Sequence, residues 1–506
     1  MESRKKIFKN FIFSVVGQAL MIVIGLVLPR LYIVSYGSEV NGLLNSLNQF
    51  IVYLSLFEAG IGAMTLQALY APIAKKNWNN VNKVLAATNK YYKRAGRWYF
   101  LSLLLLAVVY PFVVKSELSK VSIMLAAIFN GLGNVIMFYC QGKYKLLLQA
   151  EGKNYIITNL TTVIFILTSL AKVLLIQLGM DFVAVLFASL VIGLSQVFYI
   201  EWYIRKNYPQ LNLKVEPDYD SLSQKNYTLI HQLSSLIFNN TDALVLTLFC
   251  GLKVVSVYSM YKMIISQLEK VLTILSDAVS FAMGQTFQVD KEQFKKMIDT
   301  FEILYSSVSF CLFSVALYLF VPFMKLYTAG VSDIEYADTK LALLFVSAAL
   351  LTAMRLPMLL TINYAGHFKM TTPQTIAESV INIVVSVLSV FKFGIYGVLI
   401  GTIVALLYRT NDVILYSNRL ILKRSAKKTY KIYIINLIVM LMVELLFSKI
   451  FPQTIKNYFV LLIVGAISVV VAGISFLGIQ LLANKEECKF LRKQISVKMM
   501  ERQGQK

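Results

Sequence analysis

Charged residues, cysteine and histidine are all scarce in this chain. Only 15% of its 506 residues are charged, which excludes an ordinary soluble protein. The four cysteines lie in apolar segments or near the C-terminus without paired spacing, so we expect neither a disulfide nor a metal site. A Gly-rich phosphate loop ending in Lys-Ser or Lys-Thr is also missing from the sequence, which argues against direct drive by ATP.

Apolar residues are abundant instead. The chain is 58% hydrophobic and its mean hydropathy is +0.67. Apolar runs of about 20 residues, enough to cross about 30 Å of hydrocarbon as a helix, recur along its length. Isolated strands would leave backbone groups unpaired in lipid, so the spans must be helices. The sequence predicts an all-α integral membrane protein with about fourteen transmembrane helices, near residues 11–35, 41–70, 98–114, 121–140, 155–178, 182–204, 228–250, 254–283, 303–326, 341–363, 372–391, 396–416, 432–447 and 458–482.

The basic residues concentrate on alternate connections between these spans. Membrane proteins carry an excess of Lys and Arg on the cytoplasmic side, so this pattern predicts that both termini are cytoplasmic. It also explains the formal net charge of +23 as a topology signal, and we expect no nucleic-acid partner.

An internal repeat divides the chain. A shift of 214 residues lays Gly37 on Gly251, Gly152 on Gly366, and Arg205 on Arg419. Six spans separate the copies, so the two halves are parallel repeats about an axis along the membrane normal. The predicted organisation is an N-terminal six-helix lobe (1–210), a C-terminal six-helix lobe (211–425), two additional transmembrane helices (426–482) and a basic cytoplasmic tail (483–506).

Polar residues inside the spans recur at helical spacing and form stripes. Such stripes either hydrogen-bond neighbouring helices, at about 0.6 kcal/mol each, or line a polar cavity. Both explanations remain open for the amides. The stripe residues are Gln18, Asn45, Asn48, Asn130, Asn134, Gln232, Asn239 and Asn382.

Ionisable residues inside the spans favour a cavity. Each costs about 2.5 to 3.5 kcal/mol at mid-helix and must be offset by a partner or by water. Under the repeat, Arg30 and Asp242 lie at nearly matched depths, which is compatible with a pair between the lobes; a local partner or water for each is the alternative. The candidates are the cations Arg30, Lys172, Lys262 and Arg355 and the carboxylates Glu58, Asp242 and Glu378.

Two stretches near the N-terminus, "LPRLYIVSYGSEVNGLLNSLNQFIVYLSLFEAGIGAM" and "LYAPIAKKNWNNVNKVL", resemble the Wzx-type polysaccharide flippases of the MOP (MATE-related) superfamily. The stretch "NNTDALVLTLFCGLKVVSVYSMYKMI" resembles the start of that family's second half. The resemblance implies a flippase that moves undecaprenyl-diphosphate-linked oligosaccharide repeat units across the bacterial cytoplasmic membrane by alternating access, for O-antigen, capsular or exopolysaccharide synthesis. It implies a secondary transporter and not an enzyme, with no cofactor, and it leaves coupling to a proton or sodium gradient open. Membrane lipids and other polysaccharide-assembly proteins are the implied partners.

The predicted charges suit that substrate. A sugar diphosphate needs cations, for which we expect the four basic residues above, while the three carboxylates hold the empty cavity together or bind coupling ions. An ion-coupled multidrug exporter of the MATE type is the alternative, and its cavity should be net negative. A membrane oligosaccharide polymerase is less favoured, because it would need a substantial outer domain that the short outer connections do not provide.

Overall fold

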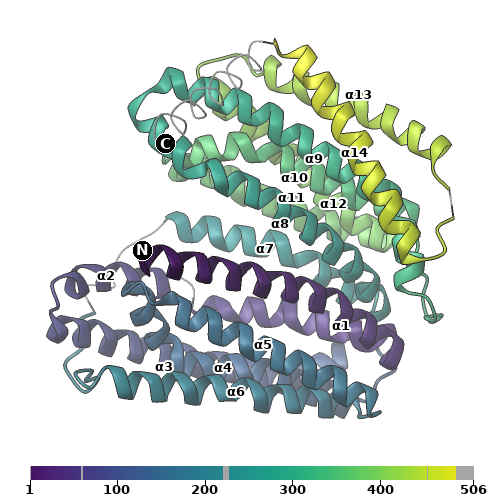
Figure 1. The fold of residues 1–506 in the computed structure, drawn as a ribbon. Coiled ribbons are helices and arrows are strands. Elements are labelled where there is room, and N and C mark those ends of the chain that lie inside the picture. Colours follow the sequence, from purple (N-terminus) through teal and green to yellow (C-terminus); the bar gives the residue numbers. More distant parts are fainter. Residues whose placement is uncertain (1, 59–60, 220–226, 453, 486–506) are drawn as a thin grey trace. The chain divides into compact units, whose positions relative to one another are not determined.

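The computed structural model describes residues 2–58, 61–219, 227–452 and 454–485, which form helices and connecting turns without a strand (Figure 1). This confirms the predicted all-α fold. The side chains of Gln18, Glu58 and Gln232 lie outside the described part of the chain. The elements are α1 (Glu2–Leu54), η1 (Ser55–Glu58), α2 (Ile61–Ala74), α3 (Trp78–Val113), α4 (Lys120–Ala150), α5 (Asn154–Gln177), α6 (Phe182–Asn207), α7 (Tyr227–Phe249), α8 (Leu252–Val289), α9 (Lys291–Tyr327), α10 (Thr339–Tyr364), α11 (Phe368–Phe393), α12 (Ile395–Tyr416), η3 (Ser417–Ile421), α13 (Lys427–Ile450) and α14 (Tyr458–Ala483).

Ten of these helices are long and apolar enough to cross a membrane, and α7 contains a shorter apolar stretch, Leu233–Phe249. The first predicted span and the second as far as Leu54 lie in α1, whose two helical segments meet at Gly37 (φ 82°, ψ 171°). The rest of the second predicted span includes η1 and most of α2. A positive φ is strained for any residue with a Cβ, so glycine is the residue that permits this break. The protein is therefore a multi-pass membrane protein.

The chain divides into two compact units. Unit 1 is Met1–Val257 with Val331–Ile334, and unit 2 is Tyr258–Gly330 with Glu335–Lys506. Polar contacts with α1 explain why α7 belongs to unit 1: the hydroxyls of Tyr53 and Thr241 are 2.9 Å apart, and Thr247 donates to Ser46 at 2.7 Å. The lobe boundary expected at residue 210 from the repeat stays a prediction.

The backbone shows the same pattern twice. Helices α5 and α11 begin at Asn154 and Phe368, 214 residues apart. The glycines that the repeat aligns share a left-handed conformation, which glycine adopts without strain at turns and helix ends. Their φ angles are 82° (Gly37) and 86° (Gly251), and 73° (Gly152) and 68° (Gly366). The aligned glycines thus share a positive φ, and the repeat itself stays a prediction.

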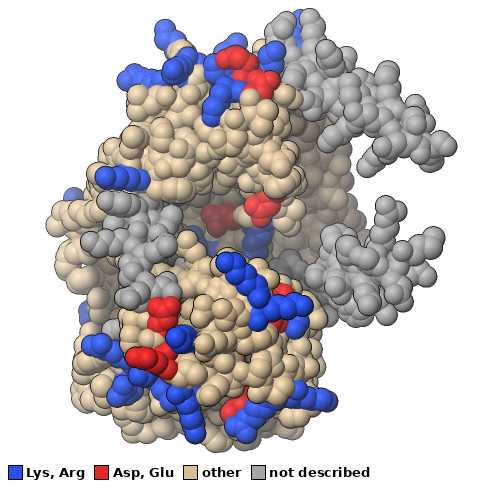
Figure 2. Space-filling model, turned by 90° about the vertical axis from the view of Figure 1, so that its left-hand side faces the viewer, with Lys and Arg blue, Asp and Glu red and all other residues tan. Residues whose placement is uncertain are grey.

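Exposed basic residues gather at one end of the helices in each unit. In unit 1 this end contains the turn from α2 to α3 and the end of α6, and in unit 2 the turn from α8 to α9 and the end of α12. Figure 2 looks onto this end and shows more Lys and Arg than Asp and Glu on each unit. The side chains include Lys75, Lys76, Arg94, Arg97, Arg205 and Lys206 in unit 1, and Lys291, Lys369, Arg419, Lys423 and Lys427 in unit 2.

The last two helices are part of unit 2, and ion pairs hold the start of α13 against α9. Arg424, just before α13, pairs with Asp299 and lies 3.0 Å from Glu302, both on α9. Lys428 of α13 adds a contact of 2.5 Å to Asp299. The Glu302 side chain is completely buried, so its charge depends on these partners. We therefore expect α13 and α9 to move together.

Helices α11 and α12 approach each other closely because α12 carries two glycines four residues apart. A Cβ on Gly401 would lie 2.2 Å from Ser386 Oγ, and a Cβ on Gly397 would lie 2.3 Å from the Ser389 carbonyl oxygen. Small residues at this spacing let the backbones of membrane helices meet. The contact fixes the position of α12 against α11, and so the position of the polar residues described below.

Replacing Asp338 by Ala should destabilise unit 2 by about 1 kcal/mol, because Asp338 caps the start of α10. Its Oδ1 accepts hydrogen bonds from the amides of Lys340 (2.7 Å) and Leu341 (3.1 Å), and its Oδ2 accepts one from the Tyr396 hydroxyl. Burial raises the pKa of the Asp338 carboxyl, but these hydrogen bonds outweigh burial and leave the pKa below its ordinary value. The cap therefore stabilises the protein above the ordinary Asp pKa of about 3.9 and is lost as the pH falls further. Thermal unfolding of the purified protein measures the loss.

The exposed carboxylate Glu335 provides the control. Glu335→Ala should unfold like the wild type at neutral pH. If Asp338→Ala did so too, the cap would not contribute to stability.

Candidate functional site

Four charged side chains from three helices of unit 2 form one ion-paired group, which we call the arginine cluster: Arg355, Glu378, Arg409 and Asp412. Arg355 of α10 donates to Glu378 Oε1 of α11. Arg409 Nε of α12 lies 3.7 Å from Glu378 Oε2, and Arg409 Nη1 donates to Asp412 of the same helix. The cluster is therefore electrically balanced, with two cations and two carboxylates.

The centre of the cluster is buried and its edges are more accessible. The side chains of Arg409 and Glu378 are 4% and 7% exposed, whereas those of Arg355 and Asp412 are 18% and 21% exposed. Arg409 Nη2 also donates to the Thr375 hydroxyl at 3.0 Å. Thr375 and Glu378 lie three residues apart on α11, so one helix face presents both to Arg409.

The sequence predicted Arg355 and Glu378 but missed Arg409 and Asp412. Both missed residues lie in the twelfth predicted span, three residues apart, which is the spacing of a basic and an acidic residue on one helix face. That spacing could have identified Arg409 and Asp412 as an ion pair in the sequence. Chemically, two guanidinium groups on one shared carboxylate, that of Glu378, form a site where phosphate oxygens can replace the carboxylate oxygens, because arginine binds both groups through N–H donors.

The predicted polar stripe of α11 continues from the cluster into a helix contact. Asn382 is completely buried, and its Nδ2 donates to the Thr402 hydroxyl of α12 at 3.0 Å. Ser386 Oγ donates to the Val398 carbonyl oxygen at 3.1 Å. These groups hold α11 against α12.

In unit 1 the stripe amides make similar contacts. Asn45 Nδ2 donates to the Asn41 carbonyl oxygen at 2.8 Å, and Asn41 Nδ2 donates to Ser256 at 2.7 Å. Asn48 accepts from Asn130 Nδ2 of α4 at 2.9 Å. These amides therefore hydrogen-bond neighbouring helices or their own helix, which is the first of the two explanations for the polar stripes.

The two other stripe residues are less closely held: Asn134 of α4 lies beside the Tyr99 hydroxyl of α3, and Asn239 bonds within its own helix. Asn134 is half-buried on α4. Asn239 is exposed on α7, and its Nδ2 donates to the Ser235 carbonyl oxygen of its own helix at 2.8 Å.

Arg30 and Asp242 both belong to unit 1, on the adjacent helices α1 and α7. Asp242 is buried, and the neighbouring Thr241 contacts Tyr53 of α1. Arg30 is half-buried and follows Pro29 within α1. The pairing between these two charges stays a prediction.

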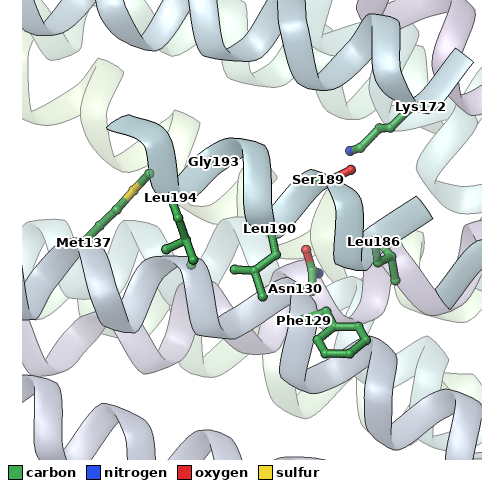
Figure 3. Close-up of a pocket in the computed structure, with 10 residues that line it drawn as sticks. Phe129, Asn130, Met137, Lys172, Leu186, Ser189, Leu190, Gly193 and Leu194 are labelled. Carbon is green, nitrogen blue, oxygen red and sulfur yellow. The ribbon is translucent and has the colours of Figure 1, made fainter. Parts of the chain in front are cut away.

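The remaining two predicted cations differ from the arginines. Lys172 of α5 lines a cavity of about 150 Å³ in unit 1, together with Asn130 of α4 and Ser189 of α6 (Figure 3). Lys262 is half-buried on α8 in unit 2. Neither lysine forms an ion pair with another described residue.

Neither a protein-family model nor a curated protein sequence matches this chain. Solved structures do match. The lipid II flippase MurJ in its inward closed conformation has a TM-score of 0.62 at 14% identity, covering 93% of this chain and 99% of the flippase. A multidrug resistance MATE family transporter of the MOP superfamily, in its inward-facing conformation, has a TM-score of 0.60 at 14% identity, covering 81% and 95%. The chain has the fold of the MOP-superfamily transporters. Its neighbours in structure are transporters and flippases, and not enzymes.

Proposed function

We propose that this protein is a flippase that moves a lipid-linked oligosaccharide diphosphate across the bacterial cytoplasmic membrane by alternating access. The observation that carries the proposal is the arginine cluster, which places two guanidinium groups, from Arg355 and Arg409, beside one carboxylate inside the membrane region of unit 2. A diphosphate carries the charge and the oxygen geometry that such a pair binds. Substrate binding would then exchange a carboxylate of the protein for phosphate oxygens.

The extent of the structural matches supports a flippase. The match to the flippase MurJ covers 93% of this chain, whereas the match to the MATE transporter covers 81%. A chain with two helices beyond the first twelve is thus matched more completely by the flippase. Of the helices concerned, α13 is fixed to α9 by Arg424 and Lys428, and α14 donates a hydrogen bond from Gln480 to the Ile432 carbonyl oxygen of α13. We propose that they bind the lipid tail of the substrate.

The proposal includes the cellular setting. Both termini would be cytoplasmic, with the basic ends of the two units on that side, and a proton or sodium gradient would drive the cycle. The products would supply O-antigen, capsular or exopolysaccharide synthesis, together with other assembly proteins of that pathway.

A multidrug exporter is the second candidate, and the match to the MATE transporter at a TM-score of 0.60 favours it. The two functions predict different substrates. An exporter of organic cations requires carboxylates that bind the cation, whereas a flippase of diphosphates requires guanidinium groups that the phosphate oxygens can reach.

Arg355→Ala should slow transport of a lipid-linked oligosaccharide at least tenfold. The reason is that a hydrogen bond to a charged group contributes about 1.5 to 3 kcal/mol, and about 1.4 kcal/mol corresponds to a factor of ten. The assay uses the full-length protein in proteoliposomes and a fluorescent undecaprenyl-diphosphate oligosaccharide, whose arrival in the opposite leaflet is followed by quenching. Arg355→Lys should recover only part of the rate, because lysine cannot form the paired contact.

Two controls sharpen the assay. Arg419→Ala removes an exposed arginine near the end of α12 and should flip lipid like the wild type. Ethidium transport is measured in the same vesicles. Wild-type protein that moves ethidium and leaves the lipid in place would overturn the flippase proposal in favour of the exporter.

A further inference from the structure

Helices α4, α5 and α6 of unit 1 line a cavity that is separate from the arginine cluster of unit 2. Its volume is about 150 Å³. At about 30 Å³ per molecule in liquid water, it holds several water molecules, and a group of that size such as a phosphate. Its lining residues are Phe129, Asn130, Gly133, Met137, Lys172, Leu186, Ser189, Leu190, Gly193 and Leu194.

The cavity exists because two facing helices carry glycine at this depth. A Cβ on Gly193 of α6 would meet no atom within 4 Å, and a Cβ on Gly133 of α4 would lie 3.6 Å from Leu190 Cδ1. A Cβ at Gly193 would therefore fit without displacing its neighbours, and a longer side chain would extend into the cavity that Gly193 lines.

Lys172 brings a positive charge to this space. It lies five residues before Gln177, the last residue of α5, or about 8 Å along the helix at 1.5 Å per residue. Lysines near the ends of membrane helices commonly extend to the interface, where water hydrates the ammonium group. Figure 3 shows Lys172 turned instead toward Ser189 on α6.

The chemistry of the lining selects an anion. No Asp or Glu is present among the ten lining residues, so a cation would find only lysine's positive charge and neutral groups. The Ser189 hydroxyl donates to the Val185 carbonyl oxygen at 2.7 Å, and the Asn130 amide donates to Asn48. The ammonium group of Lys172 has three N–H donors, and none of the described lining residues offers a carboxylate to receive them, which fits phosphate oxygens.

We propose that the cavity formed by α4, α5 and α6 is a second phosphate-binding site, in which Lys172 binds the phosphate group of a membrane lipid. The assignment of the lipid-linked oligosaccharide as the source rests on the proposed function, and the headgroup of a bulk anionic lipid is the other source of the same chemistry. In the predicted topology the site lies toward the outer face, so it would receive the diphosphate after translocation.

Amine footprinting tests the proposal on the wild-type protein. The full-length protein is placed in phosphatidylcholine nanodiscs, lysines are methylated with formaldehyde and a borohydride, and modification of Lys172 is measured by mass spectrometry. Undecaprenyl diphosphate should reduce the modification rate of Lys172 about tenfold. Lys120, exposed at the start of α4, is the internal control and should be modified equally with and without the lipid.

The source of the phosphate is assigned by a second lipid. Protection by phosphatidylglycerol in place of undecaprenyl diphosphate would support the site and assign it to bulk lipid, whatever the flipping assay shows. Gly193→Leu fills the cavity and keeps the lysine, so it should abolish protection by either lipid. Equal modification of Lys172 in all three membranes, or full protection in Gly193→Leu, would overturn the proposal.

Discussion

Arg409→Ala is expected to destabilise the protein by about 3 to 5 kcal/mol, the cost of breaking a buried ion pair by removing one partner. The Arg409 side chain is only 4% exposed and contacts Glu378, Asp412 and Thr375. Its removal leaves two carboxylates with a single arginine, Arg355, in a cluster whose centre is buried. Thermal unfolding of the detergent-solubilised protein, read from the soluble monomer fraction, measures the loss.

The experimental control for the loss of one positive charge is Arg419, an exposed arginine just after the same helix. Arg419→Ala removes the same charge from an accessible site and should change stability by less than about 0.5 kcal/mol. The double replacement Arg409→Met and Asp412→Leu restores the charge balance and should recover most of the stability without recovering transport. Equal unfolding of Arg409→Ala and Arg419→Ala would show that the cluster is not a buried network.

Gly401→Ala is expected to cost about 3 kcal/mol, although it adds a single methyl group. That methyl would lie 2.2 Å from Ser386 Oγ and 2.6 Å from the Ser386 backbone nitrogen, so α11 and α12 would have to separate. Overpacking of a core costs about 1 to 3 kcal/mol, and a backbone atom cannot rotate away as a side chain can. The separation would also lengthen the bond from Asn382 to Thr402, the residue after Gly401. The same unfolding assay applies.

The matched control is Gly473→Ala on α14, where an added Cβ would meet no atom within 4 Å. It makes the same chemical change in a helix and should leave stability within about 0.5 kcal/mol of the wild type. A Gly401→Ala protein as stable as Gly473→Ala would contradict the close contact between α11 and α12.

Helix identity and helix ends were predictable because both depend on local chemistry. Apolar runs of sufficient length must be helical in lipid, and the positive φ at Gly37 and Gly251 follows from the conformational freedom of glycine. The predicted gap between the first two spans, residues 36–40, contains Gly37, where the two helical segments of α1 meet. The sequence did not show that the break is confined to one residue, because a glycine between two apolar runs is equally compatible with a loop.

The candidate site was predictable only in part. Arg355 and Glu378 stood out because an isolated charge in a membrane helix needs a partner, and the structure pairs them. The sequence does not reveal which carboxylate an arginine meets. Glu378 also contacts Arg409, a residue 31 positions later on another helix, and that choice depends on the spacing of α11 and α12 set by Gly397 and Gly401.

By itself the sequence determined the all-α membrane fold, the basic ends of the helices and the presence of charges that demand partners, because hydropathy, charge and glycine geometry act over a few neighbouring residues. Only the tertiary structure decided what each polar group does. In the structure Asn41 and Asn382 hydrogen-bond neighbouring helices, and Arg409 and Asp412 belong to the arginine cluster. Lys172 lines a cavity. The physical reason is that partners and empty space are supplied by helices distant in the chain, whose separation depends on packing and not on local sequence.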